Sequence, residues 1–405
     1  MSHDRPIPSL ADEHTTLDEL GPKLVRIAGA VGLVALGLAV VLGYARGDGW
    51  QSFGWSYLLG FAFFLSLSLG GLFFVAIGHV TGAVWNVVSR RLAEVTAANL
   101  ATLALLAVPV MVLAHRVMPW ASGESDAPAA LLEAKAPFLN LEFFYVRWAI
   151  YFVIWCGYAW WFWKRSLEQD TTGDPAISVR MARKSGLCLL LFALSVSFAA
   201  YDLLMSLAPS WFSTMFGPYF FAGSFLGFMA FLTLMTFWLQ GRGRLRHIIH
   251  VEHLHDYGKL MFAFVFFWAY LAFSQYMLIW YANIPEETEW FLIRQSNGWG
   301  WIGLVLVFGH FLIPFAGLLA QVAKRRKASL AFWAVWILTM HWVDLYWIVM
   351  PQWRPGGPTV EWLDLLTFVG IGGLYVAGLG RLASGRSLVA RRDPRIDDSL
   401  AFENA

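Results

Sequence analysis

The sequence predicts an all-α, polytopic membrane protein with about ten transmembrane helices, and two observations carry that prediction. Of the 405 residues, 58% are hydrophobic and only 14% are charged, whereas a soluble domain carries about 25% charged residues. Apolar runs of roughly 18 to 27 residues, the length that a hydrocarbon core of about 30 Å requires of a helix, begin at Val25, Gly54, Leu100, Phe143, Leu187, Met215, Leu260, Trp299, Leu330 and Leu363. The composition therefore excludes a soluble enzyme.

Basic residues predict how these helices are oriented. The first apolar run lacks a small-residue cleavage pattern behind it, so we interpret it as a retained helix and not as a secretory signal. Most lysines and arginines fall in the N-terminal segment, in every second connection, as in Lys324–Lys327, and in the C-terminal tail. Because such residues are retained in the cytoplasm, both termini are expected there. A basic cluster can also bind anionic lipid or a partner, but topology alone explains these runs.

A motif that occurs twice predicts the domain organisation. DLLMSLAPSW, starting at Asp202, and DLYWIVMPQW, starting at Asp344, each have proline seven and tryptophan nine residues after the aspartate. Aligning them superposes helix five on helix nine and predicts two four-helix bundles, helices 2–5 over residues 54–207 and helices 6–9 over residues 208–350, as parallel repeats. The flanking parts are a cytoplasmic segment (1–24), helix 1 with an outer loop (25–53), an outer loop with helix 10 (351–380) and a cytoplasmic tail (381–405).

The two aspartates are the first candidates for function. An ionised carboxylate inside a bilayer costs on the order of 3 kcal/mol and tends to mark a proton or ligand path. At 1.5 Å per residue, Asp202 and Asp344 lie roughly 8 to 9 Å below the outer boundary, and Gln275 falls at a similar depth. His341 precedes Asp344 by one helical turn and shares its face, while His310 lies deeper. These residues predict a polar pocket in the outer half of the membrane.

A histidine beside a carboxylate under aromatic side chains suits quinol oxidation, which needs hydrogen bonds, a proton acceptor and an apolar cavity. The same groups also suit a proton relay alone. The proton-transfer candidates are Asp202, Asp344, His341 and, near the inner end of helix two, His79. The quinone-binding candidates are His310, Gln275, His341 and Asp344. In an alternative interpretation the aspartates are simply neutralised by each other, by Arg147 or by helix-terminal backbone. In another, His310 and His341 are the axial ligands of a haem.

The sequence lacks the motifs of a resident redox centre. It has no CxxCH, no four-cysteine ferredoxin spacing, no GxGxxG in a βαβ context and no phosphate-binding loop, and Cys156 and Cys188 fall inside predicted helices as packing residues. The segment HIIHVEHLHD has four histidines at spacings that permit zinc only weakly, so we predict no metal site and interpret it as a protonatable mouth or a docking surface. Any haem or iron–sulfur centre is expected in partner subunits.

Four segments carry a resemblance to a known family: EHLHDYGKLMFAFVFFWAYLAFSQYMLIWYANIPEETEW, HFLIPFAGLLAQ, KRRK and HWVDLYWIVMP. They resemble the smaller NrfD-type, or polysulfide-reductase-like, integral membrane subunits (the ActF type) of bacterial alternative complex III. The resemblance implies a quinol:cytochrome c (or other periplasmic acceptor) oxidoreductase of the bacterial inner membrane. It implies multihaem cytochrome c and iron–sulfur subunits and a larger NrfD-like paralogue as partners, and no nucleic acid.

The resemblance also bears on the cofactor and on the site. The chain would carry no covalently bound group, with quinone or menaquinone as its one expected ligand besides membrane lipid, and it would not be catalytic alone. Because the family's principal quinol pocket is attributed to the larger paralogue, Asp202, His341 and Asp344 would form a second quinone pocket or part of a proton route. The rival hypotheses are a proton-coupled transporter and a purely structural anchor for peripheral redox subunits.

Overall fold

The computed structural model describes residues 9–123, 125 and 127–404, and the first eight residues of the predicted cytoplasmic segment lie outside this range. The described residues form helices and no strands, which confirms the all-α prediction. Nine stretches of them are long and apolar enough to cross a membrane, so the chain is a multi-pass membrane protein. They are α1 (Leu20–Arg46), α2 (Gln51–Val80), α3 to α5 (Val87–Ala98, Leu100–Leu106 and Val108–Val112), α10 (Pro175–Leu203), α11 (Phe216–Gly241), α12 (Val251–Ala282), α14 to α15 (Trp299–Val305, Leu306–Leu312 and Ile313–Leu319), α17 (Lys327–Trp353) and α18 (Trp362–Ala383).

A further long helix, α9 (Leu141–Thr172), runs between the same two ends of the bundle. Its 32 residues correspond to about 48 Å of helix. Arg147 and many tryptophan and tyrosine side chains lower its mean hydropathy below that of the other nine. Short helices complete the chain: η1 (Leu10–Asp12), α6 (Ala114–Val117), α7 (Pro119–Ser122), α8 (Ala129–Lys135), η2 (Met205–Leu207), α13 (Pro285–Gln295), α16 (Gln321–Arg325) and α19 (Ile396–Leu400).

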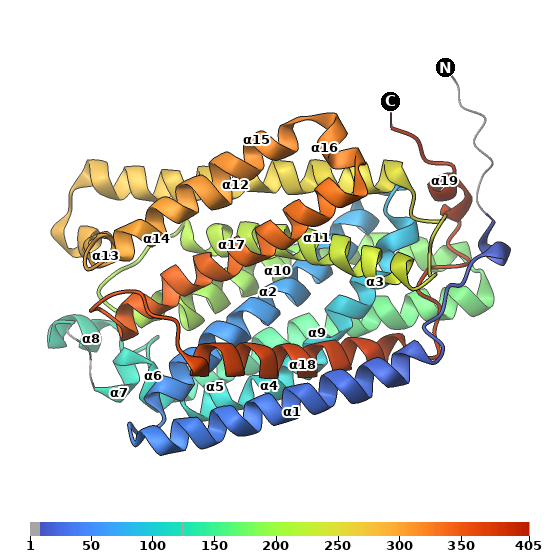
Figure 1. Ribbon diagram of the computed structural model, residues 1–405. Helices are drawn as coiled ribbons and strands as arrows, with labels where there is room; N and C mark the ends of the chain where they lie inside the picture. Colours follow the sequence, from blue (N-terminus) through green and yellow to red (C-terminus); the bar gives the residue numbers. More distant parts are fainter. Residues whose placement is uncertain (1–8, 124, 126, 405) are drawn as a thin grey trace.

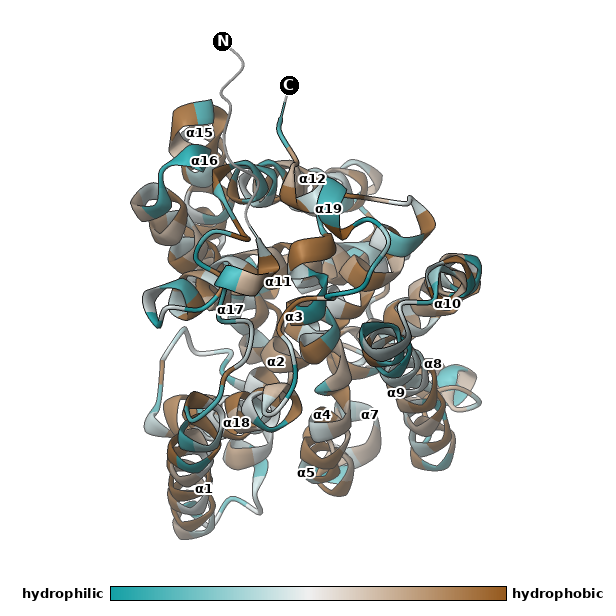
Figure 2. Cartoon of the chain, turned by 90° about the vertical axis from the view of Figure 1, so that its right-hand side faces the viewer, coloured by the Kyte–Doolittle hydropathy of each residue, from teal (hydrophilic) through white to brown (hydrophobic). Residues whose placement is uncertain are grey.

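The bundle has two ends, which we call the terminal face and the far face. The terminal face carries both chain termini and the connections at residues 242–250 and 384–404, and Figure 2 looks directly onto it. The far face carries α6 to α8, α13 and the connection at residues 354–361. Both aspartate motifs end at the far face, since α10 and α17 start at the terminal face.

The helix α2 forms the centre of the bundle. In its most apolar 18-residue stretch, 94% of the residues are buried, as expected for a helix that is hydrophobic on all sides. It packs against α3, α10, α11, α17 and α18. Gly70 permits the close approach of α11, because a Cβ there would lie 2.4 Å from the Cβ of Phe228 and 2.7 Å from the carbonyl oxygen of Ser224.

The helices form two packing circuits, one that includes α2 and one that lies beside it. In the first half of the chain α3 contacts α9, α9 contacts α10, and α10 returns to α2. In the second half α11 contacts α12, α12 contacts the α14–α15 segment, and that segment contacts α17, which returns to α11. Each circuit lies within one half of the chain, but α2 packs against α11, α17 and α18 as well as against α3 and α10, so the division into two four-helix bundles stays a prediction.

The helices α1 and α18 form a closely packed pair at one side of the bundle (Figure 1). Glycines allow their backbones to touch: a Cβ at Gly32 would lie 2.7 Å from the amide nitrogen of Leu374, and one at Gly373 would lie 2.6 Å from the carbonyl oxygen of Ala28. Small residues at such crossings are the usual basis of helix association in lipid.

The helix α3 starts at Val87, well before the predicted start at Leu100. Its first turns contain Arg90, Arg91 and Glu94, which hydropathy assigns to a connection but which are fully buried. Arg90 Nε lies 3.1 Å and Arg91 Nε 2.9 Å from the two carboxylate oxygens of Glu94. Arg90 Nη2 also lies 2.7 Å from Asp393 Oδ2 of the C-terminal tail. Mutual neutralisation therefore extends the helix through a charged segment.

Candidate functional site

The first aspartate of the repeated motif is neutralised by an arginine. Arg147 on α9 donates from Nε to Asp202 Oδ2 at 2.9 Å and from Nη2 to Oδ1 at 2.7 Å. Tyr151, one turn further along α9, donates its hydroxyl to Oδ2 at 2.8 Å. A two-pronged pair of this kind is the strongest geometry that arginine and a carboxylate adopt, so the arrangement at Asp202 agrees with the neutralisation alternative.

The second aspartate has no such cation. Asp344 accepts a hydrogen bond from the hydroxyl of Tyr219 on α11 and one from Trp268 Nε1 on α12, the latter at 3.1 Å. Its side chain is buried, and among the described residues it forms no ion pair. The two copies of the motif therefore hold their carboxylates differently. Asp202 is paired with a cation, whereas Asp344 has no cationic partner among the described residues.

His341 lies one turn before Asp344 on α17 and is buried in a slot on α11. A Cβ at Gly227 would lie 2.9 Å from the imidazole, and one at Gly223 would lie 3.3 Å from it, so both glycines make room for the ring. His341 Nε2 lies 2.8 Å from the hydroxyl oxygen of Ser66 on α2. The central helix thereby reaches the face of α17 that carries Asp344.

His310 lies in a π-helical segment, Leu306–Leu312, between α14 and α15. Pro314 explains the π turn, because proline has no N–H to donate to the carbonyl of His310 four residues earlier. The imidazole of His310 packs against the indole of Trp268, with ring centroids 4.1 Å apart. Neither ring nitrogen of His310 has a hydrogen-bond partner among the described residues.

A cavity of about 700 Å³ lies in the far-face half of the molecule, between α12, α13, α14 and α17. Tyr219 and Trp268 form part of its wall, and their polar hydrogens point to Asp344 behind them. Phe266 and Phe273 on the rim are exposed on the outer surface of α12, where a membrane protein faces lipid. The volume and the aromatic lining match those of small-molecule sites.

Gln275, Arg294 and Gln295 are polar side chains that also line this cavity. Gln275 Oε1 accepts a hydrogen bond from the Ser213 hydroxyl at 2.9 Å, which leaves its amide N–H groups available. The guanidinium carbon of Arg294 on α13 lies 3.5 Å from the ring centroid of Trp290. Three backbone carbonyls, those of Trp290, Trp347 and Ile348, accept hydrogen bonds from Arg294, and two of its five N–H groups remain available.

The comparisons with known proteins identify no family. No protein-family model matches the sequence, and a search of curated proteins finds no significant match. The candidate site therefore rests on its geometry.

The structure gathers part of the predicted residue set. Gln275 lines the cavity, Asp344 lies one hydrogen bond behind the wall, and His310 packs against that wall through Trp268. His341 lies one turn deeper on α17. By contrast, Asp202 lies apart, between α9 and α10, with its own cation.

His79 also lies apart, at the terminal-face end of α2, thirteen residues or about 20 Å from Ser66 along the helix. It is buried, with its imidazole stacked on Phe162 at 5.5 Å between centroids, and neither ring nitrogen has a partner among the described residues. Among the described residues, no chain of hydrogen bonds links His79 to the group formed by Asp344, His341 and Ser66. Its predicted role in proton uptake stays a prediction.

The histidine-rich segment contacts both ends of the chain. His247 Nδ1 lies 2.5 Å from a carboxylate oxygen of Glu13, and His253 Nε2 lies 2.9 Å from the carbonyl oxygen of Ser399. Within the described residues no three histidine, cysteine or acidic side chains are grouped as metal ligands. The segment is thus a docking surface for the N-terminal segment and the tail.

Sequence reasoning missed the residues that connect the cluster. Tyr219, Trp268, Arg294 and Ser66 have no local sequence signal that distinguishes them from packing residues. Their partners lie on other helices and far away in the sequence: 125 residues separate Tyr219 from Asp344, and 76 separate Trp268 from Asp344. The buried cation Arg294, in an otherwise acidic connection, is the one signal that could have been used.

Proposed function

We propose that this chain is the smaller NrfD-type membrane subunit of a bacterial respiratory quinol:cytochrome c (or other periplasmic acceptor) oxidoreductase. In this proposal a quinone headgroup binds in the far-face cavity, and Asp344 exchanges its protons. The observation that carries the proposal is that two wall residues of an aromatic, membrane-facing cavity, Tyr219 and Trp268, both donate hydrogen bonds to one buried, cation-free carboxylate.

The wall of the cavity offers what a quinone requires. Its aromatic side chains can pack against the faces of the ring, and the remaining N–H groups of Gln275 and Arg294 can donate to the two ring oxygens. Oxidation of a quinol releases two electrons and two protons. The Tyr219 hydroxyl can accept a proton from a bound quinol while passing its own to Asp344. The electrons would leave to haem and iron–sulfur centres of partner subunits.

Proton movement beyond Asp344 would involve the neighbouring turn of α17. His341 occupies that turn, and its Nε2 contacts the hydroxyl of Ser66 on the central helix. This places two further groups that can donate and accept protons on the side of Asp344 away from the cavity. Asp202 would have a structural role instead, because its bidentate pair with Arg147 stabilises the ionised form.

Basic residues support the orientation in this proposal. The terminal face carries Arg242, Arg244, Arg246 and the Lys324–Lys327 cluster, and such residues are retained on the cytoplasmic side of the bacterial inner membrane. The far face, with the quinone cavity beneath it, would then meet the periplasm. Multihaem cytochrome c, iron–sulfur subunits and the larger NrfD-like paralogue are the proposed partners.

The proposal is tested by filling the cavity. Gly303 on α14 lines it, and a Cβ there would lie 3.7 Å from Trp347 Nε1, an ordinary contact, so Gly303→Leu should fold while occupying the headgroup space. We expect binding of a soluble menaquinone analogue to weaken at least about tenfold, or about 1.4 kcal/mol. The measurement is titration calorimetry on the purified chain in detergent, with quinone that copurifies quantified by extraction.

The matched control is Gly157→Leu on α9, where an added Cβ meets nothing within 4 Å. It makes the same change on an exposed helix surface and should leave quinone binding unchanged. If Gly303→Leu binds the analogue as well as the wild type does, the cavity is not the quinone site. Loss of binding in both variants would also reject the assignment.

The role of Asp344 is tested in the whole complex. An asparagine retains the shape of the side chain and can still accept from Trp268, while Tyr219 accepts from its amide. We expect Asp344→Asn to assemble with its partners and to lower quinol turnover or proton release about a hundredfold, the usual contribution of a proton-transfer group. Unchanged turnover and an unchanged proton-to-electron ratio would contradict the proposal.

A proton-coupled transporter is the second candidate, and the π-helical break at His310 favours it, because transporter sites are commonly built on interrupted helices near the midplane. Gentle purification from native membranes separates the two functions. Copurification with subunits that contain c-type haem and iron–sulfur centres supports the respiratory proposal, whereas a chain that purifies alone and colourless supports transport. Tolerance of every neutral replacement at Asp202 and Asp344 would support the anchor hypothesis.

A further inference from the structure

A second hollow region lies near the terminal face, at the opposite end of the bundle from the far-face cavity. It consists of two cavities of about 280 Å³ and 530 Å³, and both are lined by Leu24 of α1, Trp238 of α11 and Val376 of α18. The shared lining shows that the two cavities are neighbours between α11 and the α1–α18 pair, and we treat them as two parts of one groove. We call it the α1–α11 groove.

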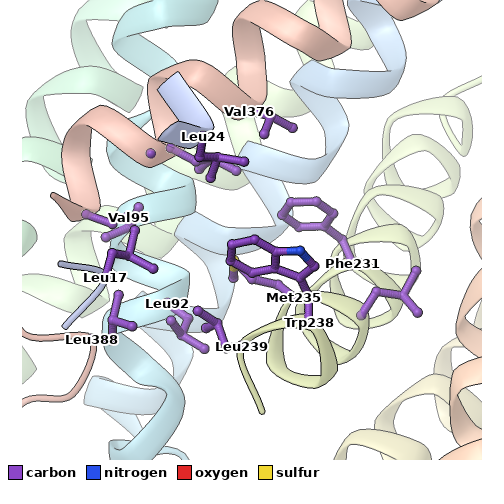
Figure 3. Close-up of a pocket in the computed structure, with 14 residues that line it drawn as sticks. Leu17, Leu24, Leu92, Val95, Phe231, Met235, Trp238, Leu239, Val376 and Leu388 are labelled. Carbon is purple, nitrogen blue, oxygen red and sulfur yellow. The ribbon is translucent and has the colours of Figure 1, made fainter. Parts of the chain in front are cut away.

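The inner part of the groove is apolar. Figure 3 shows the smaller cavity, into which Leu24, Val376, Phe231, Met235 and Trp238 project from three different helices. All of its lining residues are apolar, so this space suits a hydrocarbon chain. The groove exists because α1 packs along α18, while α11 packs against α2, α12 and α17.

Two cations line the terminal-face end of the larger cavity. Lys23, in the first turn of α1, and Arg242, just after α11, both line the larger cavity, and no acidic residue does. Among the described residues Arg242 forms no ion pair, and its guanidinium lies 5.3 Å from the ring centroid of Trp238. Lys23 has only the exposed Glu19 at 3.6 Å, a surface contact that contributes little.

We propose that the α1–α11 groove binds one anionic glycerophospholipid, with its phosphate between Lys23 and Arg242 and an acyl chain along Leu24 and Trp238. Charge complementarity selects this occupant, because both cations line the terminal-face end of the larger cavity, while Ile27, Val31 and Phe368 further along the same cavity are apolar. The bound lipid fills the gap between the α1–α18 pair and the main bundle. The site is independent of the quinone cavity and of the proposed respiratory function.

The test compares lipid binding by variants of the full chain. The double variant K23Q/R242Q removes both cations, and V376F narrows the apolar part without changing charge. The matched control, K164Q/K184Q, removes two exposed cations from the terminal-face halves of α9 and α10, which lie away from α1 in Figure 2. Each delipidated protein is titrated with phosphatidylglycerol or phosphatidylcholine, and bound lipid is counted by native mass spectrometry.

We expect one tight phosphatidylglycerol molecule on the wild type and on the control. Its affinity should fall roughly 25-fold in K23Q/R242Q, because each cation contributes about fivefold at a membrane surface, and V376F should weaken both lipids. Equal losses in the control would show that general surface charge attracts the lipid and would overturn the proposal. So would equal binding of the two lipids to the wild type, or displacement of the bound lipid by a menaquinone analogue.

Discussion

The buried pair formed by Arg147 and Asp202 makes a prediction that separates a structural from a proton-carrying aspartate. Arg147→Met keeps the bulk of the arginine stem and leaves Asp202 with the hydroxyl of Tyr151 as its one remaining side-chain donor. The aspartate side chain has 0% exposure and that of the arginine has 6%. Removing one partner of a pair buried to this extent costs about 3–5 kcal/mol, because an uncompensated charge is left behind.

The double variant Arg147→Met with Asp202→Leu should recover most of that loss. Replacing both members of a buried ion pair by apolar residues of similar size is often neutral. The free energy of unfolding is measured by helical circular dichroism in mixed micelles with a rising fraction of sodium dodecyl sulfate. The double-mutant cycle then isolates the coupling between the two residues, which should exceed about 2 kcal/mol.

Two results would refute this reasoning. If Arg147→Met alone is as stable as the wild type, the charge is not held by the arginine. If the losses of the two single variants simply add, the residues are not coupled. Turnover of the double variant in the whole complex provides the functional measure: retained activity assigns Asp202 a structural role, whereas complete loss in a stable double variant restores its predicted role as a proton carrier.

Three further predictions concern the tail, a helix crossing and the central helix. Burial alone would raise the pKa of Asp393, but the charges and hydrogen bonds of Arg90 and Arg395 outweigh it and lower the pKa to about 2. The ionised carboxylate therefore contributes about 2 kcal/mol to tail docking above about pH 4, which is lost as the pH falls through 2. Asp393→Asn should lose it at pH 7 and expose the tail to trypsin; equal cleavage of variant and wild type would contradict this. Gly32→Leu should destabilise the α1–α18 pair, which thermal unfolding in detergent detects, whereas Gly37→Leu, with nothing within 4 Å, should not. Ser66→Ala should cost about 1–3 kcal/mol in the same assay by leaving the His341 nitrogen unsatisfied, and unchanged stability would reject that contact.

The fold class followed from the sequence because hydropathy is a local property. Apolar runs of helix length marked nine spanning stretches that the structure also contains. The start of α3 did not follow, since hydropathy treats Arg90, Arg91 and Glu94 as separate charges, whereas in the fold they neutralise one another. The neutralising partner is in part the distant tail, which no local window includes.

Part of the candidate site could be predicted from the sequence, because an acidic residue inside an apolar run is energetically costly whatever its partners are. That argument found Asp344 and, through its helical face, His341. It also named Arg147 as one of three alternative ways to neutralise the aspartates, and the structure pairs Arg147 with Asp202. It could not find Tyr219 or Trp268, whose contacts with Asp344 depend on how three helices pack.

The position of α2 has a consequence for how the chain assembles in the membrane. This helix is synthesised second, yet the helices that enclose it include α11, α17 and α18, the last of which ends at Ala383. During synthesis the parts of α2 that α11, α17 and α18 cover therefore face lipid or an insertion factor until those helices have emerged. Insertion of α18 therefore completes the enclosure of α2, so the packing of an early helix depends on a late one.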